Sequence, residues 1–147
     1  MSKSSEASDN FLKGYACSQA VISIFADNIS IDELTALKIS SAFAGGMRKG
    51  ETCGVVTAAL MTLGLKYSPD SCTTLEERKP VYKLAEEFYS QFLKRHKSLI
   101  CQELLGVNPC TPEGNAEAVS KNLHGTLCPV FVKDAVEILE EMLSSKA

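Results

Sequence analysis

Apolar side chains recur at helical spacing along almost the whole chain. The first stripe consists of large apolar residues with no proline between them: Phe11, Tyr15, Ile22 and Phe25. With Asp9 or Asn10 as the N-cap, this spacing predicts a helix that runs to about Ala26. Cys17 is then expected in the middle of that helix.

Two further helices are predicted in the next part of the chain. Asp32 is a suitable N-cap for the first, and the glycine pair at 45–46 ends its apolar stripe. The second is expected to begin near Thr52 and to continue to about Gly64. Both predictions depend on residues that favour helix ends.

The clearest amphipathic stripe covers residues 81–93. Thr73 or Thr74 is its predicted N-cap, because two glutamates follow where negative charge complements the helix dipole. Pro80 is comfortable only in a first turn, so we expect the helix to start close to Lys79 or to kink at this proline.

Three elements are predicted in the last third of the chain. A short helix is expected from Cys101 to Leu105, ending at Gly106. A second helix begins at 111–113, where Thr, Pro and Glu suit the N-cap, N1 and N2 positions, and it stops before Gly125. Cys128 and the proline that follows it begin a terminal amphipathic helix.

No segment has the alternating pattern of a β-strand. We therefore expect an all-α protein, an irregular single-domain bundle of about six helices. Residues 1–10 are expected to be a flexible N-terminus and residues 11–147 one helical domain. A chain of 147 residues can bury a hydrophobic core without needing disulfides or a metal.

The charge and hydropathy of the chain argue against two kinds of partner, nucleic acid and the membrane interior. Fifteen basic and 18 acidic residues give a net charge of −3 without a basic cluster, which argues against nucleic acid as a partner. The longest apolar stretch, 55–65, is too short and too interrupted for membrane insertion. The first ten residues lack the features of an export signal, so we expect a cytoplasmic protein.

Six cysteines exceed any evident structural need in such a chain, which favours a chemical role. Cys53, Cys101 and Cys128 are predicted at helix starts, where unpaired N–H groups favour the thiolate and lower a cysteine pKa. Cys53 is the expected nucleophile, and it should alkylate faster than Cys17. Cys17, expected in mid-helix, is the predicted resolving partner or additional ligand.

A glycine-rich loop, residues 45–54, leads directly into Cys53. Its flexible backbone indicates a site, with Gly50, Glu51 and Gly54 as candidate cofactor-binding residues. The glycine pair at 45–46 also suits a helix end followed by a tight turn. The loop lacks the phosphate-binding pattern of nucleotide hydrolases, which disfavours a phosphate cradle.

The remaining candidates are two histidines and two further cysteines. His124 precedes Cys128 by four residues, which suits a base, a nitrogen ligand or a residue that closes a helix. His96 is expected to be solvated at a helix end. Cys72 and Cys110 are expected to be additional loop thiols.

Four segments carry a resemblance to a known family. They are Gly14-Tyr15-Ala16-Cys17-Ser18-Gln19-Ala20-Val21, the loop from Gly45 to Gly54, Cys101-Gln102-Glu103-Leu104-Leu105-Gly106, and Cys128-Pro129 with Asp134-Ala135-Val136. In this order they resemble the C-GCAxxG-C-C family of redox-active proteins, over nearly the whole chain after residue 10. The resemblance implies a small bacterial or archaeal protein of unproven activity. It also implies that the four recurrent family cysteines correspond to Cys17, Cys53, Cys101 and Cys128.

Two chemistries suit these four cysteines. The first is thiol–disulfide exchange with Cys53 as the reactive thiolate and the others as partners, supported by a redox partner protein; its three pairings stay open. The second is a non-catalytic module in which Cys17, Cys53, Cys101 and Cys128 bind zinc or an iron–sulfur cluster. The absence of a Cys-x-x-Cys pair favours the first, although ligands from separate helices can converge. The sequence does not determine the oligomeric state.

Overall fold

The computed structural model describes residues 1–146, and their regular structure is helical. The α-helices are α1 (Lys3–Leu12), α2 (Cys17–Ile24), α3 (Glu33–Ser40), α4 (Gly54–Tyr67), α5 (Leu75–His96), α6 (Cys101–Leu105), α7 (Pro112–Ser120), α8 (Leu123–Thr126) and α9 (Cys128–Ser145). Shorter helical segments are η1 (Ala26–Ile29), η2 (Ser41–Phe43) and η3 (Gly46–Gly50). The residues described contain no strand, only an isolated bridge between Thr52 and Ile100. The all-α prediction is confirmed.

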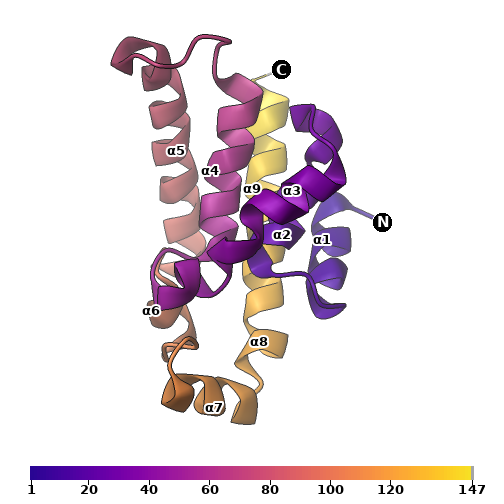
Figure 1. The fold of residues 1–147 in the computed structure, drawn as a ribbon, viewed down its shortest axis with the longest axis vertical. Coiled ribbons are helices and arrows are strands. Elements are labelled where there is room, and N and C mark those ends of the chain that lie inside the picture. The colour runs from indigo at the N-terminus through magenta and orange to yellow at the C-terminus, as the bar shows by residue number, and fades with distance from the viewer. Residues whose placement is uncertain (147) are drawn as a thin grey trace.

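Helix α9 lies at the centre of the bundle and contacts α1, α2, α4 and α5. Figure 1 shows α4, α5 and α9 as long helices side by side, with α1 to α3 on one side and α6 to α8 gathered at one end. Buried residues of α9 recur at helical spacing and include Phe131, Ala135, Ile138 and Met142. They belong to the same apolar cluster as Phe88 and Phe92 of α5. Within residues 1–146, no helix has the length and apolar character to cross a membrane.

Several predicted helix ends are confirmed with their caps. Asp32 precedes α3 and accepts a hydrogen bond from the Thr35 backbone N–H at 2.8 Å. Thr74 and Glu77 form a reciprocal capping box at the start of α5. Gly106 ends α6 in the left-handed conformation, with φ 79°. Local sequence therefore defines these boundaries.

The N-terminal segment is helical and packed in the structure. Residues 1–10 were expected to be flexible, but α1 already begins at Lys3, and Ala7 is buried in the core cluster. Ser2 caps this helix by accepting a hydrogen bond from the Ser5 backbone N–H at 3.2 Å. Tertiary packing accounts for this order, because α1 lies against α9 in the most extensive helix–helix contact of the bundle.

The expected single helix up to Ala26 is in fact two helices. Gly14 has φ +123°, a conformation that L-residues rarely adopt, and it separates α1 from α2. Cys17 is consequently the first residue of α2, not a mid-helix residue. This correction changes the chemistry expected of Cys17.

Pro80 neither delays nor divides the helix that contains it. Helix α5 begins at Leu75, before the expected start near Lys79, and includes Pro80. The capping box at Thr74 satisfies the first backbone donors, which fixes the helix start upstream of the proline.

Candidate functional site

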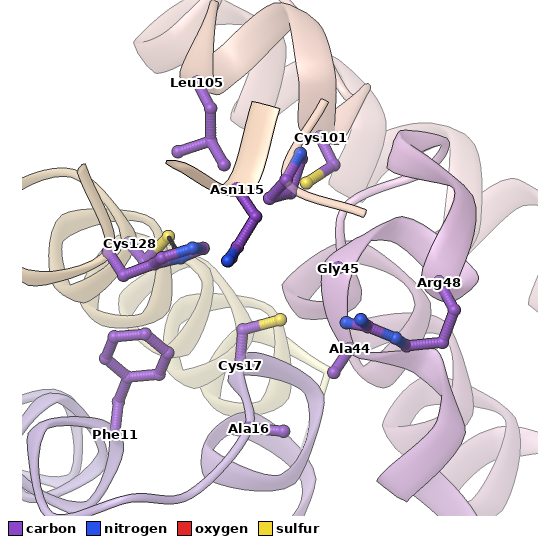
Figure 2. A pocket seen from close by; sticks show the side chains of 12 residues that line it. Phe11, Ala16, Cys17, Ala44, Gly45, Arg48, Cys101, Leu105, Asn115 and Cys128 are labelled. Atoms are coloured by element: carbon purple, nitrogen blue, oxygen red, sulfur yellow. Dashed lines mark hydrogen bonds between the residues drawn. The ribbon is translucent and has the colours of Figure 1, made fainter. Parts of the chain in front are cut away.

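A cavity of about 180 Å³ lies between the start of α2, the loop before α4, and the segments around α6 to α9. Its wall contains three thiols, Cys17, Cys101 and Cys128, which point toward the same space from three different helices (Figure 2). Arg48 and Asn115 also line it. The fold thus brings together cysteines that are separated by more than 100 positions, from 17 to 128.

Cys53 lies behind Cys17 and is buried, with 6% of its surface exposed. It is the N-cap of α4, and its backbone N–H donates to the Leu99 carbonyl at 2.8 Å. The Cys53 thiol hydrogen-bonds to the Cys17 sulfur. Two of the four predicted cysteines are therefore in direct contact. Of this pair, Cys17 lines the cavity and Cys53 does not.

Gly54 makes this contact possible. A Cβ added at Gly54 would lie 2.5 Å from the Cys17 Sγ, closer than Cβ atoms come to other heavy atoms, and 3.1 Å from the Phe43 carbonyl oxygen, which is a tight contact. A glycine directly after Cys53 therefore lets α2 and α4 approach until their two thiols meet.

Cys17 is the acidic thiol of the site. The hydrogen bond from Cys53 lowers the pKa of Cys17 to about 7, against the opposing effect of burial. Backbone N–H groups of Gly45, Ser18 and Gly54 lower this pKa further. These donors come from three separate segments that converge on one sulfur.

The other three thiols favour the protonated form. The pKa of Cys53 is raised well above its usual range because its thiol donates to Cys17, and burial adds to this effect. Burial raises the pKa of both Cys101 and Cys128 to about 12, and the negative charge of Cys17 contributes to each. The expectation that helix starts would lower these three pKa values was wrong, because desolvation outweighs the partial charge of a helix end.

The backbone from Gly45 to Arg48 forms a left-handed turn. Gly45, Gly46, Met47 and Arg48 have φ values of 65°, 65°, 59° and 60°. The conformation costs about 1–2 kcal/mol for each of the two non-glycine residues. Such strain persists only where the surrounding structure enforces it, and it is common at functional sites.

Gly46 shows what enforces the turn. A Cβ added there would lie 2.8 Å from the Cys101 Cβ and 2.5 Å from the Glu51 backbone nitrogen. The Glu51 N–H donates to the Gly46 carbonyl at 3.0 Å, and the Cys101 N–H donates to the Glu51 carbonyl. The glycine pair therefore both closes a turn and holds the loop against the start of α6.

A family model described as "Putative redox-active protein (C_GCAxxG_C_C)" matches residues 15–142. The chain belongs to this family. Searches of the curated proteins and of the solved structures each gave no match. The predicted resemblance is confirmed, and the match contains all four cysteines that carry it.

Two of the expected cofactor-binding residues lie outside the cavity of this C_GCAxxG_C_C protein. Gly50 has φ 70° and faces Asn108, since a Cβ there would lie 2.6 Å from the Asn108 Oδ1. Glu51 is exposed, and neither residue belongs to the cavity lining. Gly54 alone of the three touches the site, through Cys17.

Sequence reasoning missed three contributors to the site. Arg48 lay within the glycine-rich loop but was not singled out, and Asn115 had no local signal. Cys110, expected to be an additional loop thiol, donates from its Sγ to the Gly45 carbonyl at 3.2 Å. Its charge also contributes to the raised pKa of Cys101. Only the tertiary structure places these residues beside the family cysteines.

The two histidines have different surroundings. His124 lines the cavity, with its Nδ1 3.7 Å from the Cys128 Sγ. His96 was expected to be solvated, but only 12% of its side chain is exposed, and its Nε2 lies 2.7 Å from the Asp134 Oδ2. The expectation for His96 was wrong because the end of α5 packs on α9.

The metal-binding alternative requires a converging set of ligands. Among residues 1–146, no three His, Cys, Asp or Glu side chains are grouped closely enough to hold a metal ion. All six cysteines are free thiols, and Cys72 is exposed. The residues described therefore do not form a preformed ligand set for zinc or an iron–sulfur cluster.

Proposed function

We propose that this protein is a thiol–disulfide oxidoreductase in which Cys17 attacks and Cys53 resolves. One observation carries the proposal: a thiol with a lowered pKa lines a cavity and accepts a hydrogen bond from a second, buried thiol. The nucleophile is therefore Cys17, in place of Cys53, which the sequence favoured.

In the first half-reaction, the Cys17 thiolate attacks one sulfur of a substrate disulfide. The substrate S–S bond breaks, one substrate thiolate leaves, and a mixed disulfide forms on Cys17. Cys17 then no longer carries the charge that raises the pKa of Cys53, so Cys53 loses its proton more easily. The released substrate thiolate takes up that proton.

In the second half-reaction, the Cys53 thiolate attacks the Cys17 Sγ. The mixed disulfide breaks, the second substrate thiolate leaves, and a Cys17–Cys53 disulfide remains. Two electrons have passed from the cysteine pair to the substrate. A dithiol reductant, which we propose is carried by a redox partner protein, returns the pair to thiols by the reverse exchange.

In this proposal Cys101 and Cys128 are not the attacking thiols. Their pKa values of about 12 keep them protonated while Cys17 is charged, so one thiolate acts at a time. A reducing compartment such as the cytoplasm suits a protein whose six cysteines rest as free thiols.

Counting thiols and mapping disulfides test the proposal. Mild oxidation should remove two thiols reversibly, and peptide mapping by mass spectrometry should place the bond between Cys17 and Cys53. Cys17→Ser and Cys53→Ser should each abolish this bond, whereas Cys72→Ser, at an exposed position, should leave it intact.

Two results would overturn the assignment. One is oxidation that leaves the Cys17 and Cys53 thiols unchanged. The other is stoichiometric zinc or iron, found after anaerobic purification, that is lost together with any of the four family cysteines. That result would support the metal-binding alternative.

A further inference from the structure

The permanent charge on the cavity wall is positive. Arg48 is its only permanently charged side chain, and no carboxylate belongs to the lining among the residues described. Arg48 also forms no ion pair within residues 1–146. A guanidinium without a carboxylate partner beside a cavity favours an anionic ligand.

The backbone conformation of residues 45–48 determines where the Arg48 side chain lies. Its own φ of 60° lies in the left-handed region, and the missing side chain of Gly45 leaves room for its guanidinium. A Cβ added at Gly45 would lie 2.7 Å from the Arg48 Nη1. In Figure 2 the guanidinium extends toward the cavity that the Cys17 sulfur faces.

The remaining wall suits a short organic molecule. Phe11 and Leu105 supply apolar surface, and the Asn115 amide points into the space. A volume of about 180 Å³ is below the roughly 300–1,000 Å³ typical of pockets for drug-sized ligands. The cavity therefore suits a ligand smaller than a drug-sized molecule.

We infer that the cavity takes a low-molecular-weight disulfide that carries a carboxylate, held by Arg48 with its S–S bond at Cys17. This inference rests on the proposed thiol–disulfide function and names its substrate class. The guanidinium offsets the repulsion between the attacking thiolate and an anionic substrate. Without it, a chain with a net charge of −3 would disfavour anions.

Three short symmetric disulfides test the charge preference. Dithiodipropionate is anionic, hydroxyethyl disulfide is neutral and cystamine is cationic. Mass spectrometry of the Cys53→Ser variant, which accumulates the mixed disulfide on Cys17, gives the rate for each probe. Each rate is divided by that of free mercaptoethanol with the same probe, which removes the probe's own reactivity.

We expect the normalised rate to be at least about tenfold higher for the anionic than for the neutral probe, and lowest for the cationic probe. Adding Arg48→Gln should reduce this preference to about twofold or less, because the anionic probe loses far more rate than the neutral probe, and Arg48→Lys should keep part of the preference. Lys49→Gln removes the same charge from an exposed neighbour outside the cavity and should change nothing. The preference should weaken with added salt.

The outcomes separate the inference from the function on which it rests. If the neutral probe reacts at Cys17 and the charge of the probe has no effect, the substrate class is wrong and the oxidoreductase proposal stands. Arg48→Gln slowing all three probes equally would also overturn the substrate class. If no probe forms a mixed disulfide at Cys17, both proposals fail.

Discussion

At the scale of single residues, the acidity of Cys17 depends on neighbours that are distant in sequence. The Cys53 thiol and the backbone N–H groups of Gly45 and Gly54 stabilise its thiolate. None of these groups is within 25 positions of Cys17 along the chain. The reactivity of this cysteine is therefore a property of the packed site.

The pH dependence of alkylation tests this point. The rate of Cys17 alkylation by iodoacetamide should rise with pH to a midpoint of about 7 and then level off, because the thiolate is the reactive form. Cys53→Ala removes the largest stabilising interaction, so the midpoint should move upward. Peptide-resolved mass spectrometry measures both, and faster labelling of Cys53 than of Cys17 would contradict the assignment.

Gly54 provides a second test at the residue scale. Gly54→Ala forces a Cβ to within 2.5 Å of the Cys17 Sγ. We expect it to slow Cys17 alkylation at pH 7 by about tenfold and to destabilise the protein by about 1–3 kcal/mol through overpacking.

Gly64 is the matched control, because it lies in the same helix and a Cβ there would meet nothing within 4 Å. Gly64→Ala should leave alkylation unchanged and raise the free energy of unfolding by up to about 1 kcal/mol. Equal alkylation rates in the two variants would show that the approach of α4 to Cys17 is not needed.

At the scale of elements, a polar cluster fastens the end of α5 to α9. His96 lies between the rings of Phe92 and Phe131, with centroid distances of 4.8 and 4.9 Å. Its partner Asp134 also lies 3.2 Å from the Arg95 guanidinium, and 19% of the Asp134 side chain is exposed. These contacts hold the segment that leads into α6 and Cys101.

Removing the carboxylate should loosen this junction. Asp134→Ala is expected to lower the free energy of unfolding, measured in urea, by about 1–3 kcal/mol, because it leaves partly buried donors without an acceptor. Glu141→Ala is the control, since that side chain is 66% exposed and 4.0 Å from Arg95. Its effect should stay below about 0.5 kcal/mol, and similar losses in both variants would contradict a special role for Asp134.

At the scale of the whole molecule, the N-terminal helix is part of the bundle and of the site. Helix α1 packs along α9, and Phe11 near its end lines the cavity. The segment expected to be a flexible tail thus closes one side of the site.

Truncation tests this role. Deleting residues 1–10 should lower the urea midpoint markedly, because it exposes the face of α9 that α1 covers. It should also raise the accessibility of Cys128 to alkylating reagents. Removal of Met1 alone, which is 91% exposed, should change neither measurement, and an unchanged midpoint after the longer deletion would support the flexible-tail prediction.

The sequence by itself determined the all-α fold, the starts of most helices after residue 30 and the family. Caps such as Asp32, Thr74 and Thr111 act on backbone donors two or three residues away, so their effect can be predicted locally. The family cysteines are equally visible in the sequence, because their identity does not depend on packing.

Only the tertiary structure decided which cysteine is acidic, which thiols meet and which cation faces them. Cys17, Cys53 and Arg48 come from three different segments, and burial and hydrogen bonds depend on how those segments pack. A helix start is a local property, whereas the desolvation that raises the pKa values of Cys101 and Cys128 is not. For this reason local reasoning found the four cysteines but reversed the order of their acidities.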